Sequence, residues 1–254
     1  MHLFKSTQLL AFLIFSTQAY ALSTHKEGVY LGILTGWQNS HIKTKTACYL
    51  AGSFFQNLPS SHLVSNGGLG GVCLGYDILV SRFLLGAEIL GNFSSGSNLV
   101  SDPLPKFTGS PVSSPCTCKI SALRNLELTM RAGYSFGPWL PFVKIGWGLS
   151  GYGLTSTSPV VPALAIGYVQ GKTEGNLSSF VIGGGVDMAL TQHIILGLSA
   201  SVYFSGTTTV SFRGQSLTSY NPAGQALHLP ISFSSITLFT MVELKYKFPV
   251  EPWR

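Results

Sequence analysis

The residues that could do chemistry in this sequence are few, and their spacing is regular. Its 254 residues include only 9 Asp and Glu and 15 Lys and Arg, and several of these alternate with apolar residues. The carboxylates concerned are Glu88, Glu127, Asp187 and Glu243, and the cations are Arg131, Lys144 and Lys245. Such groups can act as acid and base, form a charged gate, or neutralise one another in buried ion pairs. Which of these applies depends on the elements that carry them.

The elements that carry these charges are predicted to be β-strands. Apolar residues fall on alternate positions, the period of a strand rather than a helix. In the last segment the even positions are mostly apolar, whereas Glu243, Lys245 and Lys247 hold odd positions. The eight segments with this pattern are 29–37, 72–76, 83–89, 126–134, 143–149, 180–190, 194–204 and 236–248. One face of each strand is therefore expected to meet an apolar surrounding, and the other to hold the charges.

Short and long connections alternate between these segments. Those around residues 79–81, 137–139 and 191–192 are short, whereas those at about 39–66, 94–119, 155–176 and 206–233 are long. This alternation is typical of outer-membrane barrels, which have an even number of strands. An open sheet cannot lie in lipid because its edge amides would lack partners. We therefore predict an all-β fold, a closed eight-stranded antiparallel transmembrane β-barrel, with periplasmic termini and four long extracellular loops.

The composition favours the same class of protein. Charged residues make up 9% of the chain and hydrophobic residues 45%, with 29 glycines and a mean hydropathy of +0.34. A soluble domain carries about 25% charged residues. Beyond the N-terminus, no apolar run approaches the roughly 18 residues of a transmembrane helix. These properties exclude a disordered chain, a helical membrane protein and a typical cytosolic enzyme.

Residues 1–21 are predicted to be a cleaved signal peptide. A basic start with His2 and Lys5 precedes a short apolar core, and Ala19 to Ala21 form an A-x-A cleavage site. Residues 22–254 would then form one barrel domain in the outer membrane of a Gram-negative bacterium.

The inward faces of the strands suggest what the charges do. An eight-stranded barrel is just wide enough for its own side chains to fill. Because buried charge costs several kcal/mol unless it is paired, we expect the seven charged residues named above to form an interlocking ion-pair network. Asp77, Arg82 and Lys247 are expected nearer the periplasmic end of the interior. Acid–base chemistry and a narrow gate for small solutes are the alternatives.

Three segments resemble a known family. Residues 28–32, 140–148 and 180–193 are similar to segments of the opacity-like outer-membrane surface proteins, whose barrel is similar to the OmpA transmembrane domain. The resemblance implies a structural and surface-interaction role, in adhesion or envelope contact, without catalysis. It also implies that the barrel-assembly machinery reads the aromatic residues of the last strand, here Tyr246 and Phe248. Members of that family usually end on such an aromatic, whereas here six residues, Pro249 to Arg254, follow.

A lipid-modifying enzyme is a further alternative. His62, Ser65 and Asn66 are similar to the His-Ser-Asn run of lipid A deacylases, but that motif has one residue between His and Ser and lies on a membrane strand. His193 has no Ser or Asp partner that the sequence can place. Because these signals have low specificity, we expect no catalytic residue and no cofactor.

The cysteines fall mostly in the predicted loops. Cys48, Cys116 and Cys118 lie in the first two loops, whereas Cys73 is expected to point into the barrel. An oxidising compartment favours a disulfide from Cys48 to Cys116 or Cys118. A C-x-C pair without a histidine at ligand spacing is a weak metal signal, so we expect no metal site.

The net charge of +6 suggests anionic partners. The predicted external cations are His41, Lys43, Lys45, Lys106, Lys119, Lys172 and Arg213, with Arg124 at the external rim. There is no basic run or basic aromatic face, so we expect no nucleic acid. The expected partners are outer-membrane lipids, with the phosphates of lipopolysaccharide, or an acidic host surface ligand. Charges that contact only water are the alternative.

Overall fold

The chain folds almost entirely into β-strands. The structure, a computed structural model, describes residues 27–50, 53–57, 61–95, 97–102, 116–160, 167–214 and 227–249. Its strands are β1 (Gly28–Leu50), β2 (Ser53–Asn57), β3 (Ser61–Val80), β4 (Phe83–Ser94), β5 (Ser97–Asp102), β6 (Cys116–Tyr134), β7 (Trp139–Val160), β8 (Gly167–Ala189), β9 (Ile194–Ser205), β10 (Thr208–Gly214) and β11 (Leu227–Pro249). Among these residues no helix is long and apolar enough to cross a membrane. The predicted signal peptide and the tail after residue 249 lie outside the described residues.

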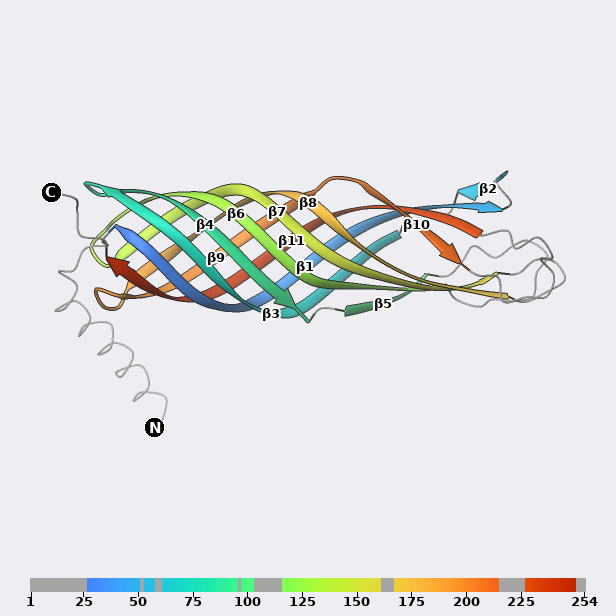
Figure 1. The fold of residues 1–254 in the computed structure, drawn as a ribbon, viewed down its shortest axis with the longest axis horizontal. Coiled ribbons are helices and arrows are strands. Elements are labelled where there is room, and N and C mark those ends of the chain that lie inside the picture. Colours follow the sequence, from blue (N-terminus) through green and yellow to red (C-terminus); the bar gives the residue numbers. More distant parts are fainter. Residues whose placement is uncertain are drawn as a thin grey trace, which may run out of the picture.

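Eight of the eleven strands form a closed barrel. β1, β3, β4, β6, β7, β8, β9 and β11 pair in this order, each antiparallel to the next. β11 also pairs with β1, over a register that runs from Gly28 opposite Pro249 to Tyr49 opposite His228. Figure 1 shows the tilted strands winding around an elongated barrel. Every barrel strand therefore has two neighbours, and the predicted closed eight-stranded fold is confirmed.

The short connections lie at one end of the barrel. β3 and β4 are joined by Ser81 and Arg82, β6 and β7 by residues 135–138, and β8 and β9 by residues 190–193. Ser81 and Gly137 adopt φ angles of 60° and 63°, the left-handed conformation that tight hairpin turns use. β1 begins and β11 ends at this same end (Figure 1).

At the other end the strands run further than the hydrophobic pattern indicated. β1 continues to Leu50 and β7 to Val160, inside two of the predicted loops, and β6 and β11 likewise begin within the other two. The short strands β2, β5 and β10 add to β1, β6 and β11 in this region. Backbone pairing continues in these extensions, although apolar and polar residues no longer alternate there in the sequence. Sequence patterning therefore detects the lipid-facing part of each strand and misses its extension.

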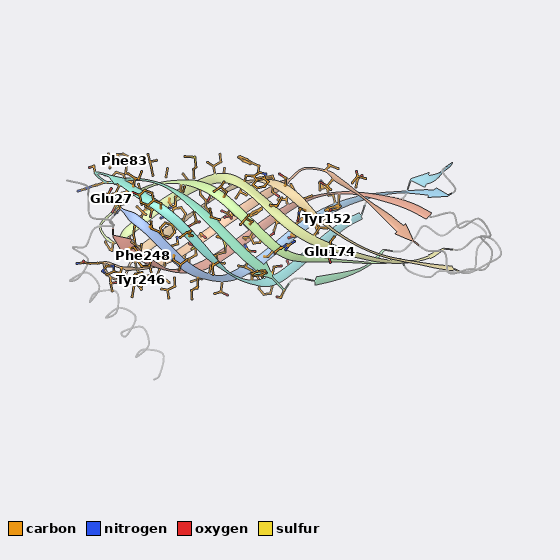
Figure 2. The ribbon with its side chains drawn as sticks, in the orientation of Figure 1. Glu27, Phe83, Tyr152, Glu174, Tyr246 and Phe248 are labelled. Carbon is orange, nitrogen blue, oxygen red and sulfur yellow. The ribbon has the colours of Figure 1, made fainter. Side chains whose placement is uncertain are left out.

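The outer surface between the two ends is apolar. Large exposed side chains on this surface include Ile33, Leu85, Met130, Val143 and Leu198. Exposed aromatic residues form two groups: Tyr76, Phe83, Phe136, Trp139, Tyr246 and Phe248 toward the short turns, and Trp37, Phe93, Trp147 and Phe204 toward the long strands. Figure 2 shows Phe83, Tyr246 and Phe248 near the short-turn end. Two such aromatic girdles around an apolar band are typical of outer-membrane barrels.

Candidate functional site: the charged interior of the barrel

Among the residues that the structure describes, nine charged side chains are buried inside the barrel. They are Asp77, Glu88, Glu127, Arg131, Lys144, Asp187, Glu243, Lys245 and Lys247. Within each strand, buried and exposed positions alternate, and these charged residues occupy the buried positions between the exposed apolar residues. All seven residues expected to form a network are among them. Asp77 and Lys247, expected nearer the periplasmic end, join the same cluster. Arg82 does not, because it lies exposed in the turn between β3 and β4, where the alternation of the strands is interrupted.

Arg131, on β6, lies at the centre of the cluster. Its Nε is 3.1 Å from Asp77 Oδ1 and its Nη2 is 2.8 Å from Asp187 Oδ2. Its Nη1 is 3.7 Å from Glu88 Oε2. A guanidinium has five donors in a planar fork, so this one side chain links carboxylates from three other strands. It also lies 4.6 Å from the centroid of the Phe142 ring.

Lys144 and Lys245 converge on Glu88 from different strands. Lys144 Nζ is 3.6 Å from Glu88 Oε1, and Lys245 Nζ is 3.7 Å from Glu88 Oε2. Each lysine also has a closer carboxylate, since Lys144 Nζ is 2.8 Å from Glu127 Oε1 and Lys245 Nζ is 2.6 Å from Glu243 Oε2. Glu88 is therefore shared among cations rather than held by one.

The remaining contacts join the cluster into a single network. Lys245 Nζ is 3.2 Å from Asp187 Oδ1, and Lys247 Nζ is 3.0 Å from Asp77 Oδ2. Because Arg131 contacts both of these aspartates, no pair in the interior is isolated from the others. Removing one member of a buried pair costs several kcal/mol because its partner keeps an uncompensated charge. The network therefore resists opening.

β1 and β9, which have no buried charge among their described side chains, contribute hydroxyl donors. The donor and acceptor pairs are Tyr30 and Glu88 (2.8 Å), Tyr203 and Glu127 (2.5 Å), and Ser199 and Glu243. These bonds bring donors to three of the five buried carboxylates. All eight barrel strands thus contribute to the charged interior.

Glycines make room for the two inward tyrosines. A Cβ atom on Gly75 would lie 2.3 Å from the Tyr30 hydroxyl, and one on Gly148 would lie 2.6 Å from Cε1 of Tyr203. The role of Tyr30 as a donor to Glu88 was not predicted from the sequence. In the sequence, Tyr30 is an aromatic residue at an alternate position of the kind that carries charged residues in other strands, and this could have identified it.

An apolar layer adjoins the charged network on the side away from the short turns. The buried apolar cluster is Tyr30, Leu34, Leu69, Cys73, Leu90, Val181, Tyr203, Phe239 and Met241. Leu34 follows Tyr30 by four residues on β1, and Phe239 precedes Glu243 by four on β11. Phe239 is paired in register with the buried Ser201, so apolar and polar side chains share this level of the interior.

Two aromatic residues meet across the barrel nearer the long-strand end. The rings of Tyr152 on β7 and Phe233 on β11 lie 4.7 Å apart, edge to face, and both side chains are buried. β7 and β11 are separated by β8 and β9 in the sheet, so this contact spans the interior. Tyr152 appears toward this end in Figure 2. Burial raises the pKa of the Tyr152 hydroxyl.

The cluster includes one group with the geometry of a cation site. One ligand atom each from Cys73, Glu88 and Glu243 lies within 4.8 Å of the others, and all three residues are buried. Lys245 Nζ lies 2.6 Å from Glu243 Oε2 and 3.7 Å from Glu88 Oε2. Its ammonium already neutralises these carboxylates, so the geometry does not call for a metal.

The other residues considered from the sequence lie apart from this network. Ser65 is buried whereas Asn66 is exposed, and the side chain of His62 lies outside the described residues. His193 lies in the turn between β8 and β9, where its Nδ1 is 3.1 Å from the Lys247 carbonyl oxygen. Ser65 and Asn66 therefore lie on opposite faces of β3.

The cysteines proposed for a disulfide belong to different strands. Cys48 is on β1, and Cys116 and Cys118 are on β6, but their side chains lie outside the described residues. The aromatic rings of Tyr246 and Phe248 contact each other at 4.9 Å on the exposed face of β11. They are thus accessible from the outside of the barrel at its short-turn end.

Comparisons with known proteins agree with this geometry. A family model described as the outer membrane protein beta-barrel domain matches residues 7–207. The fold is similar to that of the outer membrane protein OprG from Pseudomonas aeruginosa, with 12% identity, a TM-score of 0.56, and coverage of 90% of this chain and 99% of that one. The outer membrane protease OmpT from Escherichia coli matches with 10% identity and a TM-score of 0.44, over 89% of this chain and 99% of that one. No curated protein matches the sequence significantly.

Proposed function

Since the chain belongs to the family of outer membrane protein β-barrel domains, we propose that its lumen is closed and that it acts at the membrane surface, without catalysis. The observation that carries this proposal is the single network of nine buried charges, to which all eight barrel strands contribute a charge or a hydroxyl. A barrel of this size has room for its own side chains and little else.

Two features of the interior oppose conduction. Opening a path through the charged network would separate Arg131 from carboxylates on three strands at once. Next to it, the apolar side chains of Leu34, Phe239 and Met241 are buried and fill part of the interior. A solute would have to disrupt both layers to pass.

Conductance measurements test the closed lumen. We expect the purified full-length protein to give no reproducible current steps in a planar lipid bilayer. Arg82→Ala, which changes an exposed turn residue, is the matched control for Arg131→Ala. Reproducible conductance of the wild type that Arg131→Ala abolishes and Arg82→Ala retains would contradict the proposal and favour a gated channel.

The surface role is assigned to the end of the barrel opposite to the short turns, where the strands extend beyond the apolar band. We propose that this end faces the outside of the cell and that both termini are periplasmic, because short turns are periplasmic in this class of barrel. The assembly machinery would then recognise Tyr246 and Phe248 from the periplasmic side. The hairpin ends opposite to the short turns would contact the envelope or a host surface.

Cell-binding measurements test the surface role. Folded full-length protein is compared with a variant in which the ends of the β1–β3 and β7–β8 hairpins are shortened. We expect the shortened variant to bind host cells more weakly, because it lacks the hairpin ends proposed to contact the host surface. The lipid-facing barrel is unchanged, so the variant should still fold. Equal binding by the two proteins would exclude adhesion through these hairpins.

A further inference from the structure

The turn between β8 and β9 contacts the end of β11, the last barrel strand. In each short turn, a carbonyl oxygen accepts a hydrogen bond from a backbone amide at the end of the adjoining barrel strand. The acceptor and donor pairs are Arg82 and Ser135 (2.8 Å), Pro138 and Ala189 (2.9 Å), and His193 and Lys247 (2.7 Å). At the third pair the side chain adds a contact, because Nδ1 of His193 lies 3.1 Å from the carbonyl oxygen of Lys247. His193 therefore contacts both backbone polar groups of Lys247.

The imidazole ring takes the place of a backbone amide in this pair. Two residues that face each other in an antiparallel ladder can exchange two hydrogen bonds, one from each amide. The amide of His193 instead donates to the hydroxyl oxygen of Thr191 at 3.2 Å, as does the amide of Ile194 at 3.0 Å. Because the carbonyl oxygen of Lys247 can only accept, Nδ1 of the ring carries the proton and donates it. The ring thus supplies the donor that the amide does not.

The same ring lies against Tyr246. The centroids of the His193 and Tyr246 rings are 5.6 Å apart and their planes differ by 11°. Tyr246 in turn contacts Phe248, and both aromatic side chains lie near the short-turn end in Figure 2. Lys247 is the residue between them. His193 therefore contacts one aromatic residue of the proposed assembly signal and the backbone that connects it to the other.

His193 lies where the pairing of β11 with β9 ends. That register ends with Tyr246 opposite Ile194, whereas the register of β11 with β1 continues to Pro249 opposite Gly28. His193 and Lys247 are 54 residues apart in the sequence, whereas β1 and β11 are the first and last strands of the barrel. Because closing a longer loop costs more entropy, the contact with His193 can form before β1 pairs with β11.

We propose that His193 is a positioning residue for assembly. It holds the end of β11 extended before β1 closes the barrel, and so presents Tyr246 and Phe248 to the assembly machinery. Without the ring, the carbonyl of Lys247 would lose its donor on this side, and the end of the strand would fray. The inference rests on the proposed recognition of these two aromatic residues from the periplasmic side.

Folding of the full-length protein with and without the assembly machinery tests this inference. Protein unfolded in urea is diluted into lipid vesicles that contain the purified barrel-assembly machinery, or into the same vesicles without it. A semi-native gel follows the folded fraction. We expect His193→Ala to lower the ratio of the assisted to the unassisted folding rate about fivefold, the factor that corresponds to one hydrogen bond. A residue that only stabilised the folded barrel would leave this ratio unchanged.

Two further variants separate the donor from the ring. His193→Asn keeps an N–H donor close to the position of Nδ1 and should retain most of the ratio, whereas His193→Phe keeps a ring without a donor and should lose it. Arg82→Ala, which changes an exposed residue of another short turn, is the matched control and should leave the ratio unchanged. Equal ratios in the wild type and His193→Ala, or equal losses in His193→Asn and His193→Phe, would overturn the inference.

Tyr246→Ala distinguishes this inference from the proposal on which it rests. A lower ratio in Tyr246→Ala together with an unchanged ratio in His193→Ala would overturn the role of His193 and keep the assembly signal. An unchanged ratio in Tyr246→Ala would overturn the signal, and the role of His193 with it.

Discussion

The Tyr203 hydroxyl donates a 2.5 Å hydrogen bond to the carboxylate of Glu127, although the two residues belong to β9 and β6, which are separated by β7 and β8. The other oxygen of this carboxylate lies 2.8 Å from Lys144 Nζ. The bond therefore spans the interior, and each oxygen of the buried Glu127 carboxylate has a hydrogen-bond or ion-pair partner.

Tyr203→Phe should destabilise the barrel by about 1–3 kcal/mol, because it removes a donor from a buried carboxylate while keeping the ring. The free energy of unfolding in urea, measured by tryptophan fluorescence in lipid vesicles, reports the effect. Tyr246→Phe is the control, since this ring lies on the outer face of β11. Equal losses in the two variants would show that the hydrogen bond has no special role.

Arg131→Met should destabilise the barrel by about 3–5 kcal/mol, because three carboxylates lose their shared cation. The same urea measurement applies, together with the temperature at which the folded form is lost on a semi-native gel. Arg82→Met should change the free energy of unfolding by less than about 0.5 kcal/mol, as expected of an exposed turn residue. A small effect of Arg131→Met would argue against a cooperative network.

Gly75→Ala should destabilise the barrel by about 1–3 kcal/mol, because its new Cβ would lie 2.3 Å from the Tyr30 hydroxyl. Gly70→Ala is a control on the same strand, where the nearest atom would be the Leu34 carbonyl oxygen at 3.9 Å. Unfolding curves recorded under identical conditions compare the two. The prediction fails if Gly70→Ala is as damaging as Gly75→Ala.

Val143→Arg should destabilise the folded barrel by about 2–4 kcal/mol, as a charge near the bilayer midplane does. Val143 is 66% exposed and lies halfway between Trp139 and Trp147 on β7. Val64→Arg, near the end of the apolar surface, should cost only about 0–1 kcal/mol. The difference between these two free energies of unfolding in vesicles is the test, and its absence would mean that the apolar band is placed wrongly.

The thiol of Cys73 should resist alkylation until the barrel is denatured, because it is 1% exposed within the apolar layer. Mass spectrometry after maleimide treatment of folded and denatured protein measures this. Omitting the reductant in the same experiment counts the remaining free thiols, and a disulfide among Cys48, Cys116 and Cys118 would leave one of those three to react. Rapid labelling of Cys73 in the folded protein would contradict the buried layer.

The sequence alone determined the fold class, the eight barrel strands and the inward parity of the charged residues. It could do so because alternation is local: a strand between lipid and a narrow interior repeats its pattern every two residues. Glu88, Arg131 and Lys245 were assigned to the interior by parity without knowledge of any contact.

Only the tertiary structure decided which charges meet. Glu88 contacts cations from three strands, and Tyr30 and Phe142 lie beside Arg131. Such contacts depend on the tilt and stagger of the closed barrel, which no single segment encodes. The same holds for the apolar layer around Phe239, because its residues come from different strands and meet only when the barrel closes. The extension of the strands beyond the lipid-facing band is set by backbone pairing, which leaves no hydrophobic pattern to read.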